Sequence, residues 1–390
     1  MSEIKSAYLD NACIGKVHNE VAEDAHETIN MFQFMKHDPT TFTVDLYDRY
    51  KEGRNLIADS LGVSRNTICF IESTSHGLGM IANSLSLKQS DNVLVCDLEF
   101  FSTVFCWIRH QKRVGFEVRK VKTSDGLVKV DDFKKAADSH TKAIVVSSVQ
   151  EINGYRVDIE ELSHFAREIG AYLIVDGIQE VGALNANLDN LDIDVYCAGG
   201  HKWLRNPFGT GFMYINSNLV EKLEPDFYSY FNAKNPPNGW GEYLESPKRT
   251  PFDHFEMEVG ASKFETGATL NYVGAFGLIK SFELLNSYGY KNIEKQVLDR
   301  RKYLQKGLMD MGVKINGSIN EKNLSGICTF NLEDGIQEEK KLMKKYKENR
   351  IYCSLRYVSG IGGIRVSPHY YTTFEEIDYL LEITKDFIFG

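Results

Sequence analysis

The stretch that decides the fold is residues 171–203, which read AYLIVDGIQEVGALNANLDNLDIDVYCAGGHKW. It begins with a short apolar run that is typical of a buried strand and ends on Asp176. After a polar interval, a second short apolar run leads into GGHK, which ends on Lys202. In open α/β sheets, ligands bind at the edge formed by the carboxyl ends of the strands. The sequence therefore predicts that a carboxylate and a lysine meet at one such edge.

This pair of residues suits pyridoxal phosphate as a cofactor. A lysine can form a Schiff base with it, and an acid can keep the pyridine nitrogen protonated so that the ring accepts electrons. Each residue alone has a simpler explanation, Asp176 as a turn or capping residue and Lys202 as a solvated cation. Gln179 and His201, at fixed spacing from the pair, favour the cofactor site over these explanations.

Size and composition indicate a globular protein of two lobes. The chain has 390 residues, of which 43% are hydrophobic and 25% are charged. The net charge of −9 argues against a nucleic-acid partner and against a basic surface for membranes. No apolar run approaches the roughly 20 residues that a membrane span needs, and MSEIKSAYLDNA lacks the apolar core of a signal peptide. We therefore expect a cytoplasmic protein.

The seven cysteines are odd in number, widely scattered and without a C-x-x-C pair. This pattern indicates reduced thiols rather than a disulfide framework or a zinc site. We expect no metal site.

Strands and helices alternate regularly between residues 66 and 215. This alternation predicts an α/β protein with a mostly parallel, doubly wound sheet. Strands are expected at 67–71, 92–97, 116–121, 143–147, 171–175, 194–198 and 211–215, with helices at 77–87, 102–111, 130–137 and 159–169.

The segments on either side of this alternation complete a two-domain plan. We expect a large domain at 16–285, a smaller C-terminal α+β domain at 286–390, and an N-terminal segment, 1–15, that joins them. Residues 225–262 are rich in aromatic residues and look irregular, so they would shape a pocket or an interface, with ordinary loop packing as the open alternative. The further helices are expected at 19–35, 42–61, 271–286, 293–311, 337–348 and 374–387, and the further strands at 313–315, 326–332, 351–355 and 363–367.

Three more strand ends of the large domain carry candidate ligands. Ser75 and His76 lie between a strand and a helix, where hydroxyls and free amides bind phosphate, although serines are also ordinary helix caps. Phe100 could stack on a flat cofactor or could pack in the core. Gln150 could contact the ring hydroxyl or the substrate, with turn chemistry as the alternative.

A further candidate is Arg365, in the C-terminal run GGIRVSPHYY. An arginine inside an apolar strand needs a partner, and its planar fork suits a substrate carboxylate. A structural ion pair is the open alternative. Arg356 is a weaker candidate of the same type.

With these residues assembled, the chain resembles the class V aminotransferase family of fold type I pyridoxal phosphate enzymes. That family includes cysteine desulfurases and isopenicillin N epimerases. The resemblance extends from YLDNA to SPHYYTTFEEID, and its core is VDGIQ followed by GGHKW. It implies the fold type I architecture, with a large cofactor-binding domain and a smaller C-terminal domain.

The resemblance also implies roles for individual residues. Lys202 would be the Schiff-base lysine, Asp176 would pair with the pyridinium nitrogen, and Phe100 would stack on the ring. The remaining cofactor ligands would be Gln179 at the ring oxygen and, at the phosphate, Ser75, the backbone around His76, and His201.

Three further residues complete the implied site. Arg365 resembles the arginine that binds the substrate α-carboxylate, and Asn11 in YLDNA would also bind substrate. The segment FETGATLN resembles a loop that contacts the phosphate from a neighbouring subunit. It nominates Thr269 and implies a homodimer with its active site at the subunit interface.

Several departures from the family pattern narrow the reaction. The motif that carries a histidine over the ring in desulfurases here has Phe100. The loop before Arg365, RYVSGIGG, lacks the desulfurase cysteine, and Cys353 is a poor substitute. The ring-oxygen asparagine appears as Ser148, so that Gln150 would take over its contact.

We therefore expect an enzyme that acts at Cα of a small amino acid with Lys202 as the base. A lyase that performs β-elimination, on a C–S bond for example, is the first choice, and a persulfide-forming desulfurase is not expected. The alternatives are an aminotransferase, an amino-acid epimerase that needs a second acid such as His76, Tyr228 or Tyr230, and a protein that binds without turnover.

Overall fold

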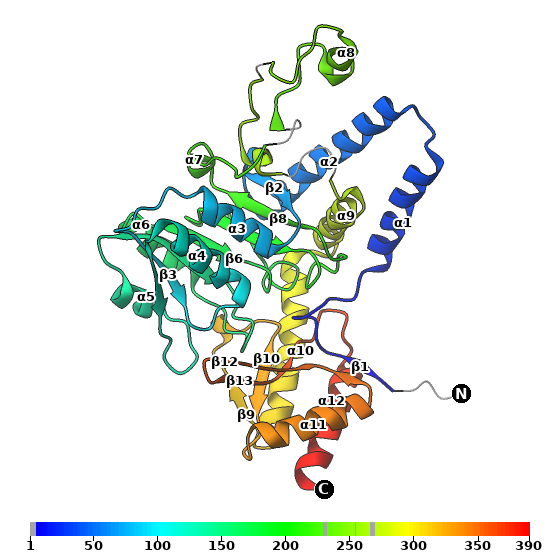
Figure 1. Cartoon of the computed structure of the whole chain (residues 1–390). Helices are drawn as coiled ribbons and strands as arrows, with labels where there is room; N and C mark the ends of the chain where they lie inside the picture. Colours follow the sequence, from blue (N-terminus) through cyan, green and yellow to red (C-terminus); the bar gives the residue numbers. More distant parts are fainter. Residues whose placement is uncertain (1–4, 229–231, 254, 266–269) are drawn as a thin grey trace.

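The computed structural model describes residues 5–228, 232–253, 255–265 and 270–390 (Figure 1). Its centre is a seven-stranded sheet with the strand order β2-β8-β7-β6-β5-β3-β4. Strands β4, β3, β5, β6 and β7 run parallel to one another, whereas β8 is antiparallel to both of its neighbours. This is the mostly parallel sheet that the alternation predicts. The strands are β2 (Ile68–Ile71), β3 (Asn92–Cys96), β4 (Glu117–Val121), β5 (Thr141–Ser147), β6 (Tyr172–Asp176), β7 (Val195–Gly199) and β8 (Gly211–Ile215).

Side chains of the buried strands alternate between two hydrophobic clusters, as the two-residue period of a strand requires. In β5, Ile144 and Val146 belong to one cluster, whereas Ala143 and Val145 belong to the other. Helices α2, α5, α6 and α9 contribute to the first cluster, and α3 and α4 to the second, so both faces of the sheet are covered. These helices are α2 (Pro39–Leu61), α3 (Thr74–Ser84), α4 (Phe101–Val114), α5 (Val130–Ala136), α6 (Ile159–Glu168) and α9 (Tyr272–Tyr288).

A second, four-stranded antiparallel sheet has the order β12-β13-β10-β9 and lies in the C-terminal part of the chain. A third hydrophobic cluster fills the space between this sheet and its helices. The long helix α10 contributes Ile293 to the cluster of the central sheet and Leu308 to this third cluster. The elements are α10 (Tyr290–Asp310), β9 (Lys314–Asn316), β10 (Cys328–Asn331), α11 (Ile336–Glu348), β12 (Ser354–Val358), β13 (Ile361–Val366) and α12 (Phe374–Phe389).

The N-terminal segment contacts both sheets. Strand β1 (Ala7–Tyr8) pairs in parallel with β11 (Ile351–Tyr352) beside the C-terminal sheet. Further along, the Gly15 amide donates to the His201 carbonyl oxygen at 2.9 Å, in the loop that follows β7. The described part of this segment therefore contacts both sheets, and its expected joining role stays a prediction. The proposed boundaries at 16–285 and 286–390 stay a prediction.

The structure differs from the sequence-based expectations at several element boundaries, and three differences are described here. The strand expected at 351–355 is two strands, β11 and β12, which pair with different partners. Helix α3 begins three residues early because the Ser73 side chain caps it by accepting a hydrogen bond from the His76 amide. The aromatic segment contains an unexpected helix, α8 (Gly239–Glu245), which projects from the body of the molecule (Figure 1).

The remaining elements are short or lie at the edge of the fold. Helix α1 (Asn19–Phe34) lies against α9 (Figure 1). In the part of the chain that the structure describes, no helix combines the length and apolar character needed to cross a membrane. The short helices are η1 (Arg65–Thr67), α7 (Ser217–Val220), η3 (Ala261–Phe264) and η4 (Glu321–Asn323).

A buried ion pair between α2 and the region after η3 provides a test of this core. Arg54 Nη1 lies 3.3 Å from Glu265 Oε2, and the Phe70 amide donates to Glu265 Oε1 at 3.0 Å. Replacing Arg54 with methionine should lower the free energy of unfolding by about 3–5 kcal/mol, because a buried carboxylate loses its counterion. Equilibrium unfolding in urea would measure this change.

The matched control is Arg65→Met, which breaks the exposed pair with Asp59 (2.8 Å). Its expected cost is below about 1 kcal/mol. Equal losses in the two variants would contradict the assignment of the Arg54 pair to the core.

Candidate active site

A cavity of about 650 Å³ lies at the carboxyl edge of the central sheet. Its walls come from the N-terminal segment, from the loops after β2, β3, β5, β6 and β7, and from the β12–β13 hairpin. The cavity brings together seven residues that the sequence nominated for one site, and it also includes the weaker candidate Arg356. The seven are Ser75, Phe100, Asp176, Gln179, His201, Lys202 and Arg365.

Asp176 is the last residue of β6, and Lys202 follows β7 by three residues. Asp176 Oδ1 accepts a hydrogen bond from the Ile178 amide (3.0 Å), and Oδ2 accepts one from Thr103 Oγ1 (3.3 Å). Burial raises the pKa of Asp176, while these bonds and the charge of Lys202 favour its ionised form. The carboxylate is thus fixed in direction and is only 4% exposed.

Burial lowers the pKa of Lys202, and the neighbouring Asp176 charge opposes this effect. A lowered pKa makes the neutral amine more accessible, which is what a lysine needs to act as a nucleophile or base. The Nζ atom lies 5.8 Å from the centre of the Phe100 ring. Lysine and aromatic ring therefore face the same part of the cavity.

The start of α3 forms a polar rim of the cavity. Ser75 Oγ donates to Ser102 Oγ at 2.7 Å, and Thr74 Oγ1 accepts from the Gly199 amide at 2.9 Å. Burial and then the Lys202 charge lower the pKa of His201 to about 4, so its imidazole is neutral at pH 7. Hydroxyls at the N-terminus of a helix and a neutral imidazole donor together suit a phosphate group.

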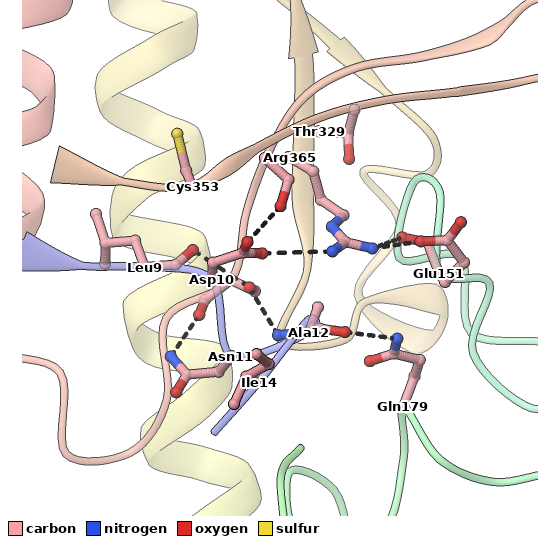
Figure 2. A network of polar contacts seen from close by, with 12 residues as sticks. Leu9, Asp10, Asn11, Ala12, Ile14, Glu151, Gln179, Thr329, Cys353 and Arg365 are labelled. Carbon is pink, nitrogen blue, oxygen red and sulfur yellow. Dashed lines mark hydrogen bonds and ion pairs between the residues drawn. The ribbon is translucent and has the colours of Figure 1, made fainter. Parts of the chain in front are cut away.

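Gln179 is held at both ends of its amide. Its Nε2 donates to the Ala12 carbonyl oxygen (3.0 Å), and its Oε1 accepts from Trp203 Nε1 (2.8 Å). The N-terminal segment thus fixes a side chain that lines the cavity (Figure 2). One N–H of the amide has no recorded partner, so the proposed contact with the ring oxygen is compatible with this geometry.

The structure does not place Gln150 at the cavity. This fully buried side chain donates from Nε2 to Glu99 Oε1 (2.9 Å) and to the Ser147 carbonyl oxygen (3.3 Å). Both of its N–H groups are therefore used within the protein, one by the Glu99 carboxylate and one by the Ser147 carbonyl oxygen at the end of β5. The expected contact between Gln150 and a ring oxygen stays a prediction, which would require this side chain to give up one of these bonds.

Other nominated residues also lie away from the cavity walls. Asn11 is buried and donates to the Ser367 carbonyl oxygen (2.8 Å), so it ties the N-terminal segment to the end of β13. The His76 ring does not line the cavity, and its amide is bound to the Ser73 side chain. Exposed Tyr228 donates to Glu224. Thr269 and Tyr230 lie outside the described residues.

Arg365 lines the cavity but is already paired. Its Nη1 donates to the carbonyl oxygen (3.0 Å) and to the carboxylate of Glu151, and its Nη2 lies 3.3 Å from Asp10 Oδ1 (Figure 2). The structural ion pair left open by the sequence is present, at a position that also faces Lys202. Sequence reasoning missed both acids, although Glu151 directly follows Gln150 and Asp10 lies in YLDNA.

Two cysteines, Cys13 and Cys353, are the thiols to compare for a role in the reaction. Cys13, which the sequence did not nominate, lines the cavity together with Lys202. Cys353 does not line the cavity. Its Sγ contacts Met343 Sδ at 3.7 Å, and burial raises the pKa of its thiol.

No group of three or more possible metal ligands occurs among the residues described here.

This geometry can be set beside known proteins. The family described as Aminotransferase class-V matches residues 7–380. The chain belongs to this family. Membership of the class V aminotransferases indicates a pyridoxal phosphate-dependent enzyme, as the sequence predicts.

Two curated relatives illustrate the range of reactions in this family. A probable cysteine desulfurase of Methanothermobacter thermautotrophicus is 27% identical over 351 residues, which cover 87% of this chain and 83% of the relative. The isopenicillin N epimerase of Streptomyces clavuligerus is 25% identical over 336 residues, with 85% and 82% covered. Both subgroups named by the resemblance are therefore represented.

Solved structures confirm the expected fold type I architecture. The apo cysteine desulfurase of Thermococcus onnurineus NA1 superposes with a TM-score of 0.85 at 22% identity and covers 98% of this chain and 94% of its own. The cystine C–S lyase C-DES, in complex with its reaction product cysteine persulfide, gives a TM-score of 0.85 at 20% identity, with 98% of each chain covered.

The residues at this class V site fit pyridoxal phosphate. The donor set contains an oriented acid for a ring nitrogen, an aromatic face, a lysine with a lowered pKa, and hydroxyls at a helix N-terminus. The N-terminal segment packs tightly against the lysine loop, because a Cβ on Gly15 would lie 1.9 Å from the Lys202 carbonyl oxygen. Phe100, Asp176, Ser75 and Lys202 would hold the cofactor here.

Glu99, beneath this site, gives a prediction for the pH dependence of stability. Burial raises its pKa from 4.5 to about 7, although Ser147 and Gln150 donate to it. Because the folded-state pKa exceeds the unfolded value, Glu99 stabilises the fold below pH 4.5 and loses this contribution as the pH rises through 7. The loss amounts to at most about 3 kcal/mol.

Glu99→Gln should therefore flatten the decline in unfolding free energy between these two pH values. Urea unfolding at several pH values would measure the slope. Glu117→Gln, at an exposed position, is the control and should keep the wild-type slope in this window. An unchanged slope in Glu99→Gln would contradict the raised pKa.

Proposed function

We propose that this protein is a pyridoxal phosphate-dependent lyase that performs β-elimination on a small amino acid, with a C–S bond as the preferred target. The observation that carries the proposal is the shared cavity of Asp176 and Lys202 at the carboxyl edge of the sheet. The substrate is expected to enter beside Arg365, and the active unit is expected to be a homodimer.

Each residue has a defined task in this proposal. Bound pyridoxal phosphate would draw electrons from the Cα–H bond of an amino acid. Lys202 takes the α-proton as general base, because its lowered pKa leaves the amine free to accept it. Asp176 is held by Ile178 and Thr103 and keeps a proton on the ring nitrogen. Phe100 covers one side of the cavity near the Lys202 amine.

The choice of a lyase over a persulfide-forming desulfurase rests on the thiols and on position 100. Cys353 is packed against Met343, and Phe100 supplies no imidazole for proton transfer. Relatives named as desulfurases and the C–S lyase C-DES share chemistry at sulfur-bearing amino acids. Cys13 is the cavity thiol that could accept sulfur if this choice fails.

The other reactions remain alternatives at the same site. An aminotransferase would return the α-proton to the cofactor side and would require a keto acid. An epimerase, like one relative, would need an acid on the face opposite Lys202. The arrangement of Asp176 and Lys202, with its oriented carboxylate, argues against a protein that binds without turnover.

The first test concerns Lys202. The purified protein should show the visible absorption band of bound pyridoxal phosphate, and Lys202→Ala should remove it because the amine that holds the cofactor is lost. Absorption spectra after reconstitution and gel filtration measure this directly. Lys263→Ala, on η3, is the control and should retain the band. An intact band in Lys202→Ala would refute the central assignment.

The second test concerns the reaction. With L-cysteine and water as reactants, the wild-type protein should release pyruvate, ammonia and sulfide in equal amounts without an added keto acid. Lys202→Ala should abolish all three products. Enzymatic assays of pyruvate and ammonia, with chromatography of amino acids, distinguish the outcomes.

Formation of alanine instead of pyruvate, together with loss of turnover in Cys13→Ser, would identify a desulfurase. A requirement for a keto acid would identify an aminotransferase. Either result would refute the lyase while leaving the cofactor site intact.

A further inference from the structure

The Arg365 guanidinium is held by two carboxylates before any substrate arrives (Figure 2). Its side chain is 2% exposed, Nη1 donates twice to Glu151, and Nη2 contacts Asp10. Both terminal nitrogens, which would form a fork around a substrate carboxylate, therefore have partners. Together the three side chains carry one net negative charge, which by itself repels an incoming carboxylate.

The two acids differ in where they lie. Glu151 lines the cavity together with Lys202, whereas Asp10 does not. Asp10 also accepts a hydrogen bond from Ser354, which fixes it on the side away from the cavity. Among the described residues, Arg365 is the recorded partner of the Glu151 carboxylate and no second one is found. Glu151 is thus the acid that a ligand in the cavity can displace.

A second arginine, Arg356, stands near this pair. Strands β12 and β13 are antiparallel, with Ser354 opposite Arg365 and Arg356 opposite Gly363. Arg356 and Arg365 therefore project from the same face of the sheet as diagonal neighbours, with Cα atoms about 7–8 Å apart. Gly363 has no side chain to separate them. Arg356 lines the cavity, and in the described part of the chain its side chain has no recorded ion pair or hydrogen bond.

We propose that Glu151 is a specificity-determining residue that exchanges between these two arginines. In the free protein it occupies Arg365, and an α-carboxylate displaces it toward Arg356. Exchanging one carboxylate for another on a buried arginine avoids the cost of leaving the charge unpaired, and Arg356 supplies a counterion for the displaced acid. The inference rests on the proposed amino-acid site and assigns to Glu151 and Arg356 the selection of ligands that carry an α-carboxylate.

The exchange makes the effects of the two side chains interdependent. Without the negative charge of Glu151, no carboxylate on the cavity side competes for Arg365, although Asp10 still pairs with it, and Arg356 has no displaced acid to receive. With Glu151 present, loss of Arg356 should weaken the binding of a carboxylate ligand. Without Glu151, the same loss should have no such effect. A double-mutant cycle measures this dependence.

The experiment uses the protein loaded with pyridoxal phosphate and follows its visible band during titration with glycine. Glycine carries an α-amino group and a carboxylate and has no leaving group. Methylamine, which lacks the carboxylate, is the control ligand. The variants are Glu151→Gln, Arg356→Gln and the double variant, and Asp10→Asn removes a charge from the same arginine on the side away from the cavity.

Glu151→Gln should bind glycine about tenfold more tightly, because the ligand no longer competes with an internal carboxylate. It should bind methylamine as the wild type does. Arg356→Gln should weaken glycine binding in the wild-type background and leave it unchanged when Glu151 is already glutamine. Asp10→Asn should change glycine binding less than Glu151→Gln does.

Three results would each overturn the exchange. They are glycine binding in Glu151→Gln that is unchanged or weaker, an equal gain for methylamine, and an equal gain in Asp10→Asn. If Arg356→Gln weakened glycine binding equally in the wild type and in Glu151→Gln, Arg356 would have no part in the exchange. Absence of the visible band in the wild type would instead refute the proposed function, so the two failures are distinguishable.

Discussion

The site depends on one costly arrangement, an acid and an amine taken out of water at the ends of two adjacent parallel strands. Burial alone raises the pKa of Asp176 and lowers that of Lys202, which drives each toward its neutral form. The Ile178 amide, the Thr103 hydroxyl and the opposite charge counter this tendency. The remaining polar contacts of the cavity keep this pair oriented. Fixed polar neighbours are needed because a charge buried in a medium of low dielectric constant is otherwise not stabilised.

Three segments distant in the sequence provide that fixation. The N-terminal segment reaches the lysine loop through Gly15 and reaches Gln179 through Ala12. Helix α3 reaches the end of β7 through Thr74. The β12–β13 hairpin closes the cavity opposite the sheet. Asp176 and Lys202 therefore lie at the edge of the central sheet, whereas the segments that surround them come from both ends of the chain as well as from the sheet.

Local patterns predicted the elements and the strand ends, because both depend on residues that are close in sequence. The apolar runs before Asp176 and Lys202 placed these two residues correctly at one edge. Contacts over long separations were not predictable in this way. Asp10 and Arg365 are 355 residues apart in the sequence, and the hydrophobic periodicity around either residue contains no information about its contact with the other. The hydrogen bond between Gln150 and the buried acid Glu99 was not predictable either, because 51 residues separate them.

The pairing of β1 with β11 has a consequence for how the protein is made. Ala7–Tyr8 and a strand more than 300 residues later are paired, and Asp10 bridges to Ser367 in the same region. A chain still emerging from the ribosome can form the central sheet, but it cannot yet pair β1 with β11 or Asp10 with Arg365. Domains generally fold as units during synthesis, so the cofactor cavity is completed only after the C-terminal sheet has been translated. Chains that stop short of β13 would lack Arg365 and thus one wall of the cavity that holds Lys202.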